Sequence, residues 1–431
     1  MKSHRSSANV TEDNDQKINR RSFLYLTGGG FATFLATRVA AMPFADMVVD
    51  MPPKITLPSL RAKNEAKEEA PSPSLPLSER VGFAIVGLGH LSIGQILPAF
   101  GKCKYARPVA LVSGHRDKAL TLASEYNIKE QSVYSYEDYD KILDNPDIKA
   151  VYIVLPNGLH AEYTIRAARA GKHVLCEKPM ANSVTECQQM IEACQSAKVK
   201  LMIAYRSQYE PFDRAIITMV KEKKLGDLRE FVSSNSQNQG DPKQWRLNRK
   251  LAGGGPLPDV GIYCINAARF LSGEEPIEIK GETFQLPGDP RFREVESSAH
   301  FLLKFPSGFT AACSCSYSSH RSQFLRLEGS EGWAELNPAY AYENLKLFHG
   351  HTINGHDVVG EVVLQPKDHF AQEIDHMAEC VMKNKQPHTP GEEGLQDQRI
   401  IEAIYESART GSVVRLDPPS STRGPDPKDQ S

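Results

Sequence analysis

Short apolar runs alternate with amphipathic segments between residues 81 and 205. Apolar runs of about four to eight residues are typical of buried strands, and longer segments with helical periodicity are typical of helices. Strands are predicted at 81–86, 107–112, 150–155, 173–176 and 200–205, and helices at 93–100, 159–170 and 184–197. Alternation of this kind predicts an α/β domain with a doubly wound parallel sheet and helices on both faces.

The alternation stops after residue 205, where the pattern changes to segments that predict antiparallel strands. Gly308 lies between two of them and marks a hairpin turn. The predicted elements are a helix at 210–223, strands at 228–234, 300–305, 309–317, 324–328 and 332–336, and closing helices at 369–383 and 391–410. We therefore expect a Rossmann domain over 81–205, an α+β domain over 206–416 and a disordered tail over 417–431.

The first 45 residues have a different pattern. A polar start ends in Arg20-Arg21 and leads into a mildly apolar run over 24–41, which contains three glycines and Arg38 and ends in small residues. These features resemble a twin-arginine signal peptide, and the interior charge disfavours a membrane span. The prediction places the mature protein in the periplasm without a stable membrane span. Because the twin-arginine route carries folded proteins, it also indicates a cofactor acquired in the cytoplasm.

Residues 46–80 form a proline-rich segment with a charge run over 63–69. Proline-rich chains are extended and semi-rigid. Two interpretations remain open for this segment: a passive tether to the signal peptide, or an arm that lies on a neighbouring subunit.

The composition indicates a folded protein of two or three domains without a nucleic-acid partner. The 431 residues include 51 Lys and Arg against 53 Asp and Glu, so the formal net charge is −2. This balance gives no electrostatic reason to expect binding to nucleic acid or to an anionic membrane. A mean hydropathy of −0.41 argues against a polytopic membrane protein. The eight cysteines include no Cys-x-x-Cys pair and are expected to be packing thiols, and no cluster of residues has the spacing of a metal site.

The start of the first domain carries a dinucleotide-binding pattern. Gly87 and Gly89 follow the strand at 81–86 and precede the helix at 93–100, as in a Rossmann unit. Gly87 permits the tight turn, and Gly89 lets the backbone approach a pyrophosphate at the helix N-terminus. Ser92 takes the third position of the pattern and is small enough for close packing of helix and strand.

The end of the second strand indicates NADP as the cofactor. Ser113, Arg116 and Lys118 offer a hydroxyl and two cations, which suit a ribose 2′-phosphate. Asp117 lies one residue too late to hold the free ribose hydroxyl of NAD.

Three motifs resemble those of the Gfo/Idh/MocA oxidoreductases. They are Gly87-Leu88-Gly89, Glu177-Lys178-Pro179, and Gly253-Gly254-Gly255 followed by Asp259-Val260-Gly261-Ile262-Tyr263. The resemblance runs over 81–416 and is closer to the periplasmic glucose–fructose oxidoreductase group, which has Tyr where the family often has His. It implies an open, mostly antiparallel sheet in the second domain, with an outer face that makes the contacts of a homo-oligomer, either a tetramer or a dimer.

The resemblance and the predicted strand ends together define a set of expected cofactor contacts. Ligands of parallel sheets lie beyond the carboxyl ends of the strands. The expected set is Gly87, Gly89, His90, Leu91, Ser113, Gly114, Arg116, Lys118, Leu155, Pro156, Asn157, His160, Glu177, Lys178, Arg206, Trp245 and Arg246.

The resemblance also implies that Tyr263, Lys178 and Asp259 are catalytic. Oxidation of a sugar hydroxyl needs a base for its proton, and Tyr263 is the expected base. A free phenol has a pKa of about 10, and Lys178 beside it would favour the phenolate. Asp259 lies one helical turn from Tyr263 and would orient the sugar. The expected substrate contacts are Lys178, Tyr205, Asp259, Tyr263, Tyr317 and Tyr342.

The predicted compartment sharpens the predicted reaction, because the periplasm has no pool of NADP. We expect NADP(H) to be tightly bound and recycled: a glucose-like aldose is oxidised to a lactone, and a second sugar, fructose or another aldose, takes the hydride in a ping-pong cycle. Three alternatives remain open. They are a conventional NADP-dependent sugar dehydrogenase with exchangeable cofactor, a sugar hydrolase that uses NAD redox chemistry, and a non-enzymatic nucleotide-sensing module.

Overall fold

The computed structural model describes residues 73–419 and 421–427. The signal peptide predicted over 1–45 and most of the 46–80 segment lie outside these residues, so both interpretations of that segment stay open. The end of the segment is described. Leu77–Glu79 forms a 3₁₀ turn, and the guanidinium of Arg80 donates to the backbone oxygens of Leu75 and Cys103, at 2.9 Å each.

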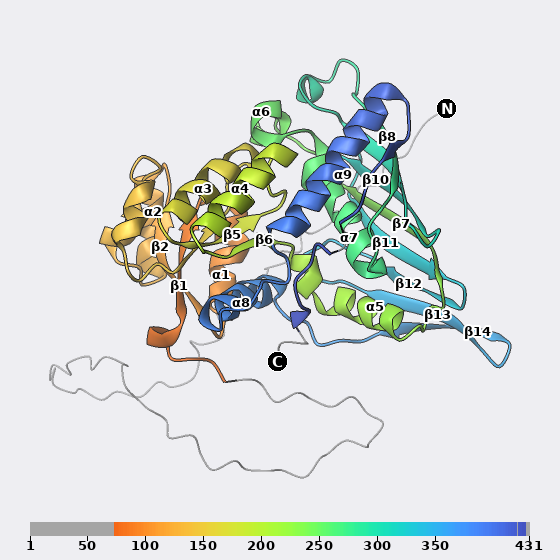
Figure 1. Ribbon diagram of the computed structural model, residues 1–431, viewed down its shortest axis with the longest axis horizontal. Helices are drawn as coiled ribbons and strands as arrows, with labels where there is room; N and C mark the ends of the chain where they lie inside the picture. The colour runs from red at the N-terminus through yellow and green to blue at the C-terminus, as the bar shows by residue number, and fades with distance from the viewer. Residues whose placement is uncertain (1–72, 420, 428–431) are drawn as a thin grey trace, which may run out of the picture. The chain divides into compact units, whose positions relative to one another are not determined.

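The first domain is built on a parallel sheet of six strands (Figure 1). In spatial order the strands are β3 (Val133–Tyr134), β2 (Ala106–Val112), β1 (Val81–Val86), β4 (Ala150–Ile153), β5 (His173–Glu177) and β6 (Leu201–Ala204). Every residue of β1 and β4 is buried, as expected for central strands covered on both faces. The strand order reverses between β1 and β4, which is where such sheets bind ligands. The predicted doubly wound sheet is confirmed.

Helices cover both faces of this sheet. On one face lie α3 (His160–Arg169) and α4 (Val184–Ser196), and on the other lie α1 (Leu97–Phe100) and α2 (Arg116–Glu125). The helix predicted at 93–100 begins with a wider π-type turn over Ser92–Ile96 before it continues as α1.

The helix α8 (His369–Met382) belongs to the core of the first domain, although it comes late in the chain. Its residues Ile374 and Met377 are fully buried and pack in the same cluster as Phe83 and Ile85 of β1. The structure therefore differs from the prediction that all of 206–416 forms a separate second domain, because α8 packs against the first sheet and completes its core. Apolar periodicity predicted the helix but not which sheet it covers.

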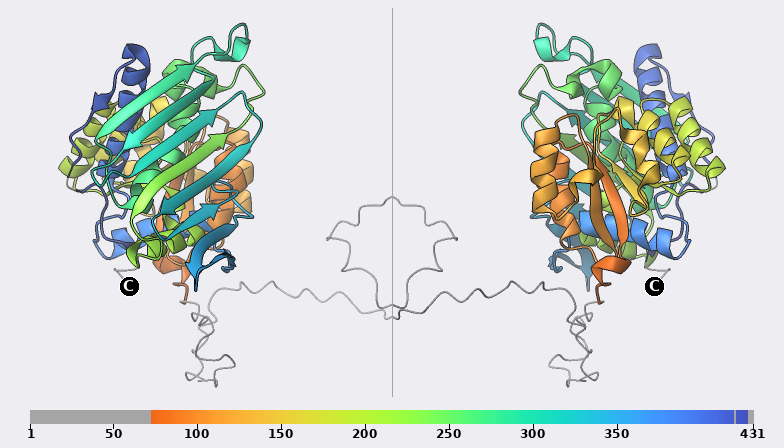
Figure 2. Two further views of the ribbon diagram at one scale, coloured as in Figure 1. Left: turned by 90° about the vertical axis from the view of Figure 1, so that its right-hand side faces the viewer. Right: turned by 90° about the vertical axis from the view of Figure 1, so that its left-hand side faces the viewer.

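The second domain is an open sheet of nine strands (Figure 2). In spatial order they are β14 (His356–Val362), β13 (Leu347–Ile353), β12 (Gly332–Leu336), β11 (Ser322–Gly329), β7 (Leu228–Ser236), β10 (Thr310–Ser316), β9 (Ser298–Lys304), β8 (Glu278–Phe284) and β15 (Val414–Arg415). Neighbouring strands are antiparallel except for the parallel pair of β7 and β10. The mostly antiparallel sheet is confirmed, and Gly308, with φ of 89°, makes the predicted hairpin turn between β9 and β10.

Helices lie on one face of the second sheet, and the left view of Figure 2 shows its other face without a helix in front of it. The helices of this part of the chain are α5 (Pro211–Lys221), α6 (Arg249–Ala252), α7 (Ile262–Ser272) and α9 (Gly391–Thr410). The sequence pattern missed α6, α7, β8, β13, β14 and β15 here, and α2 and β3 in the first domain. Helix α7 is buried almost all round and β14 is exposed along most of its length, so neither has the one-sided pattern on which prediction depends.

The tail from Asp417 is not disordered in its described part, which corrects the prediction. Thr422 is buried and its hydroxyl donates to Glu393 Oε2 at 2.7 Å, and it accepts from Arg269 at 3.1 Å. Arg423 approaches Glu393 at 3.5 Å, and Asp426 pairs with Arg214. The polar composition of the tail predicted disorder, but its partners are buried charges that come from distant elements.

Other predictions concern thiols, metals and membranes. All eight cysteines are buried and unpaired, in agreement with packing roles. Within 73–419 and 421–427, no three His, Cys, Asp or Glu side chains gather as metal ligands would. Across the same residues, no helix combines the length and apolar character that crossing a bilayer requires.

Candidate active site

The glycine turn after β1 is shaped by close packing on one side and open space on the other. Gly87 has φ of 94°, and a Cβ there would lie 2.3 Å from the backbone oxygen of Val154. A Cβ at Gly89 would meet no atom within 4 Å. Ser92 is fully buried and its hydroxyl donates to the Gly87 oxygen at 2.5 Å. The first glycine is thus required by the fold, while the second leaves room for a ligand.

The helix that follows β2 supplies one cation to this turn. Lys118 reaches from α2 to the backbone oxygen of Leu88, 2.8 Å away, and lines the same cavity as Ser113 and Gly114. Arg116, the other predicted phosphate contact, does not line the cavity. It points to the surface and pairs with Glu130 at 3.3 Å, where both side chains are more than half exposed. Its position at the exposed start of α2 was not visible in the spacing of the motif.

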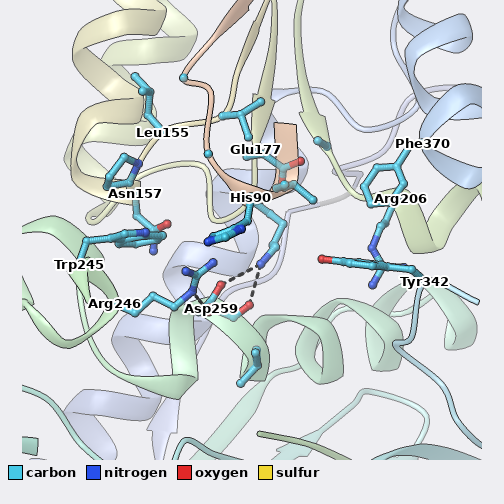
Figure 3. Close-up of a pocket in the computed structure, with 18 of the residues that line it drawn as sticks. His90, Leu155, Asn157, Glu177, Arg206, Trp245, Arg246, Asp259, Tyr342 and Phe370 are labelled. Atoms are coloured by element: carbon cyan, nitrogen blue, oxygen red, sulfur yellow. Dashed lines mark hydrogen bonds and ion pairs between the residues drawn. The ribbon is translucent and has the colours of Figure 1, made fainter. Parts of the chain in front are cut away.

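A cavity of about 630 Å³ extends from this turn to the inner side of the second sheet. Figure 3 shows side chains from both domains converging on it. The predicted residues that line it are Gly87, Gly89, His90, Leu91, Ser113, Gly114, Lys118, Leu155, Pro156, Asn157, Glu177, Lys178, Arg206, Trp245, Arg246, Asp259, Tyr263 and Tyr342. One continuous cavity therefore joins the glycine turn to the predicted catalytic residues.

His160 does not line the cavity, contrary to prediction, but it holds two cavity loops together. Its side chain is fully buried, with Nδ1 2.8 Å from the Pro179 oxygen and Nε2 2.9 Å from the Leu155 oxygen. Burial lowers the pKa of His160, which keeps the ring neutral, so each tautomer donates to one of these oxygens. The residue positions the loops after β4 and β5.

Lys178 and Asp259 form an ion pair in the lining of the cavity. Lys178 Nζ donates to the backbone oxygen of Asp259 at 2.7 Å and to its Oδ1 at 3.2 Å, while Arg246 Nε donates to Oδ2 at 2.8 Å (Figure 3). Burial acts to raise the pKa of Asp259, but Arg246 and Lys178 outweigh it and hold that pKa well below its usual range. Asp259 is therefore a carboxylate at neutral pH.

Tyr263 lies one turn after Asp259, at the start of α7. Lys178 Nζ lies 4.8 Å from the centroid of its ring, so the two are adjacent as predicted. Burial lowers the pKa of Lys178, but the neighbouring Tyr263, Asp259 and Glu177 raise it by more, so the lysine stays charged. The three predicted catalytic side chains are thus brought together from β5 and from the segment that leads into α7.

Two predicted sugar contacts lie behind the cavity wall. Tyr317 is fully buried and its hydroxyl donates to Asp259 Oδ2, so it fixes the carboxylate from behind. Tyr205 is also buried, and its ring packs in the core between the two domains. Neither lines the cavity that Tyr263 and Tyr342 line, although Tyr205 lines a small pocket together with Lys178 and Tyr263.

Four polar side chains from the second sheet also line the cavity and were not predicted from the sequence. Asn235, Gln237, Arg321 and Gln323 form this part of the lining: Asn235 and Gln323 lie in the neighbouring strands β7 and β11, Gln237 follows β7 and Arg321 precedes β11. Arg321 Nε donates to Gln323 Oε1 at 2.9 Å, and Asn235 Nδ2 donates to the Val260 oxygen at 3.1 Å. The register of β7 with β11 places Gln323 opposite Asn235, a pairing that no local sequence signal reveals.

Further lining residues were also missed. Tyr136 lies against Gly114, where a Cβ would come within 3.3 Å of its ring. The remaining ones are Leu88, His115, Val154, Ala204, Val260, Tyr340, Ala341 and Phe370. Most are apolar or come from loops of the second domain, so they have no motif of their own.

The residues of this cavity fit a dinucleotide. The open space at Gly89 lies at a helix N-terminus, where backbone N–H groups favour a pyrophosphate. Ser113 and Lys118 lie at the end expected for the adenosine, and Lys178 and Tyr263 lie at the other end. A parallel sheet with a glycine turn at its switch point, joined to a buried Lys–Asp pair beside a tyrosine, defines an oxidoreductase that binds a nicotinamide dinucleotide.

Comparison with known proteins agrees with this class. The model of an oxidoreductase family with an NAD-binding Rossmann fold matches residues 81–205, and the model of the Gfo/Idh/MocA C-terminal domain matches 214–335. The chain belongs to the Gfo/Idh/MocA oxidoreductases.

Individual relatives cover most of the chain. D-Xylose 1-dehydrogenase [NADP(+)] of Haloarcula marismortui is 33% identical over 347 residues, which are 78% of this chain and 93% of the relative. A second D-xylose 1-dehydrogenase (NADP(+)), from Haloferax volcanii, is 31% identical over 78% of this chain and 99% of its own. Among solved structures, an aldose–aldose oxidoreductase of Caulobacter crescentus complexed with glycerol is 46% identical, with a TM-score of 0.75 over 78% of this chain and all of that chain.

Proposed function

We propose that this protein is a periplasmic sugar oxidoreductase of the glucose–fructose oxidoreductase type, with tightly bound and recycled NADP(H). It oxidises a glucose-like aldose to a lactone and reduces a second sugar, fructose or another aldose, in a ping-pong cycle. The observation that carries the proposal is the buried Lys178–Asp259 pair beside Tyr263 at one end of a dinucleotide-sized cavity. The likeness to a protein named aldose–aldose oxidoreductase supports a reaction between two sugars.

NADP(H) is supported by two independent features. Ser113 and Lys118 line the cavity beyond the end of β2, where a ribose 2′-phosphate would bind, and none of the described carboxylates lines the cavity there. Both xylose dehydrogenases that resemble this chain carry NADP in their names. When bound, the nicotinamide supplies hydride transfer to and from a sugar carbon.

The side chains of the site have distinct roles in this reaction. Tyr263, as the phenolate, takes the proton from the sugar hydroxyl. The carbon that carries this hydroxyl loses its hydrogen as hydride, and the C=O bond forms. Asp259 is charged and accepts a hydrogen bond from a neighbouring sugar hydroxyl. Lys178 stays charged and holds Asp259 in place. In the reverse half-reaction Tyr263 returns a proton to the second sugar's carbonyl oxygen.

The periplasmic location rests on the Arg20-Arg21 signal and on the resemblance to exported enzymes. A compartment without NADP requires the cofactor to remain bound through many turnovers. The 46–80 segment would favour retention if it lies over the adenosine end of a neighbouring subunit.

A homo-oligomer, either a tetramer or a dimer, is supported by the outer face of the second sheet. Val232 of β7 and Leu302 of β9 are 39% and 54% exposed, and the register places both beside Ala312 of β10 on the same face. Phe284, at the end of β8, is a further exposed apolar side chain, at 52%. Exposed apolar surface of this kind is typical of subunit interfaces.

The decisive experiment is to denature the purified, exported protein and to measure the nicotinamide that it releases. We expect about one equivalent of NADP(H) per subunit. Glucose alone should reduce this bound cofactor once, and fructose or another aldose should then reoxidise it. A preparation that lacks nucleotide and turns over only with added NADP would instead identify a conventional sugar dehydrogenase with exchangeable cofactor.

A further inference from the structure

Arg206 is a buried arginine at the wall of the cavity. It follows β6 at the start of the 3₁₀ turn Arg206–Tyr209 and is only 5% exposed. Its Nη2 donates to the Tyr340 oxygen at 2.7 Å, and its Nη1 lies 3.4 Å from the Ala341 oxygen. These contacts fix the guanidinium and tie the loop after β12 to the first domain.

The plane of Arg206 is surrounded by aromatic rings. Its Cζ lies 5.0 Å from the ring centroid of Tyr263, 4.7 Å from that of Tyr342 and 5.7 Å from that of Phe370. Figure 3 shows Arg206 extended from below Phe370 onto the face of Tyr342. Tyr263 therefore lies close to two cations, Arg206 at 5.0 Å and Lys178 at 4.8 Å.

The two cations differ in their counter-ions. Lys178 shares the carboxylate of Asp259 with Arg246. Among the described residues, Arg206 has no carboxylate within 4.0 Å, and its buried Nε makes no hydrogen bond. A buried guanidinium without an anion is costly, so the site favours a negative charge on a group beside it.

The carboxyls nearest to this region do not supply that charge well. Glu177 and Glu373 lie on either side of the Tyr152 hydroxyl, at 2.9 and 3.2 Å. Burial raises the pKa of Glu177, although Lys178 and Arg206 act to lower it, and burial raises the pKa of Glu373 well above its usual range, so burial opposes a negative charge on either carboxyl. His369, 3.4 Å from Arg206, is also neutral, because burial and then Arg206 itself lower its pKa to about 2.

We propose that Arg206 is a positioning residue for the reaction: it stabilises the phenolate form of Tyr263 and so makes that side chain a competent base. The proposal rests on the proposed function for the identity of the base. Lys178 is the neighbour expected from the motif, but its ammonium is already directed at Asp259. Arg206 is the neighbouring cation whose charge is left for the phenolate.

Several neighbouring elements contribute the other charged or titratable groups around Tyr263 and Arg206. They are Glu177 and Lys178 at the end of β5, Glu210 and Asp213 at the start of α5, Asp259 before α7, Tyr340 and Tyr342 in the loop after β12, and His369 and Glu373 on α8. Burial raises the pKa of Glu210 and raises that of Asp213 well above its usual range, so burial opposes a negative charge on either carboxyl. Burial lowers the pKa of Arg206, but Tyr263 and Tyr342 outweigh it, so the guanidinium remains charged.

The test compares Arg206→Gln and Arg206→Lys with the unchanged enzyme and with Arg326→Gln. Arg326 is a suitable control, because it also stacks on an aromatic ring, Trp333 at 4.0 Å, but pairs with Glu328 and Glu335 away from the cavity. The pH dependence of kcat/KM for sugar oxidation should rise through the ionisation of Tyr263. In Arg206→Gln this limb should move to higher pH by about one unit or more. In Arg206→Lys, which keeps the positive charge, the limb should lie close to that of the unchanged enzyme. Arg326→Gln should leave it unchanged.

A second readout does not depend on turnover. The tyrosinate absorbance of each protein is titrated with and without the Tyr263→Phe change, so that the difference reports Tyr263 alone. Arg206→Gln should raise the pH at which this difference appears, whereas an unchanged midpoint, or a rate loss equal at every pH, would overturn the proposal. A Tyr263 midpoint that moves as expected in a protein that does not oxidise sugars would instead refute the proposed function and leave the role of Arg206 intact.

Discussion

The ammonium of Lys178 donates both to the backbone oxygen of Asp259, at 2.7 Å, and to its Oδ1, at 3.2 Å. This double contact joins the end of β5 in the first domain to the turn that carries Tyr263. The lysine thus places the predicted base against the first sheet as well as supplying charge. We expect Lys178→Met to lower kcat/KM for sugar oxidation by about 100-fold or more. Lys280→Met is the control, because that partly buried lysine does not line the cavity and, within the described part of the chain, its side chain donates to the Gly411 oxygen alone. Equal activity of the two variants would contradict a catalytic role.

Asp259 also gives a prediction about acid stability. Its folded-state pKa lies below the usual value of about 3.9. Its charge therefore stabilises the folded protein above pH ~4, and this contribution is lost as the pH falls through the lower, folded-state pKa. Urea unfolding should show Asp259→Asn less stable than the unchanged protein near neutral pH, with the gap narrowing in acid. A gap that is constant with pH would show that the interactions of this carboxylate do not depend on its charge.

The two glycines of the turn should respond differently to substitution. Gly89→Val adds a side chain into open space, so this variant should be purified without NADP(H) and should unfold at the Tm of the unchanged protein from which the nucleotide has been removed. Gly87→Ala requires a left-handed backbone and places Cβ 2.3 Å from Val154 O, so it should lower the Tm by several degrees. Thermal unfolding together with nucleotide release distinguishes them. A normal nucleotide content in Gly89→Val would place the dinucleotide elsewhere.

Cofactor choice should depend on Lys118 and not on Arg116. Lys118→Ala removes the cation that lines the cavity, and we expect NADP affinity to fall about tenfold or more relative to NAD affinity. Arg116→Ala should leave this ratio nearly unchanged, because Arg116 pairs with Glu130 at the surface. Fluorescence titration of the nucleotide-free proteins measures both affinities. If Arg116 proves to be the selective residue, it must turn inward when the 2′-phosphate binds.

The C-terminal segment should contribute to stability. Thr422 and Arg423 complete the polar shell around Glu393 and Arg269, which are fully buried. Deleting residues 420–431 should lower the free energy of unfolding by about 2–4 kcal/mol, because these buried charges lose partners. Deletion of 428–431 alone is the control, since it retains Thr422 and Arg423. Equal urea midpoints for the two deletions would contradict a structural role for this segment.

The sequence predicted those features that local patterns encode. The run over 81–86, the glycines at 87 and 89 and the Glu177-Lys178-Pro179 motif were sufficient for the first sheet and for one half of the site. It could not show that Arg116 faces solvent, that Tyr317 fixes Asp259 from behind, or that Gln323 lies opposite Asn235. Each of these depends on how distant elements pack, and the same residue types in the same spacing are compatible with several arrangements.

The return of α8 to the first sheet has a consequence for synthesis. A ribosome that has completed residue 205 has made all six parallel strands, yet the apolar face that Ile374 and Met377 cover is still bare. Phe370, on the same helix, also forms part of the cavity wall. The nucleotide pocket is therefore complete only after α8 has been synthesised, so binding of a dinucleotide at this site requires almost the whole polypeptide.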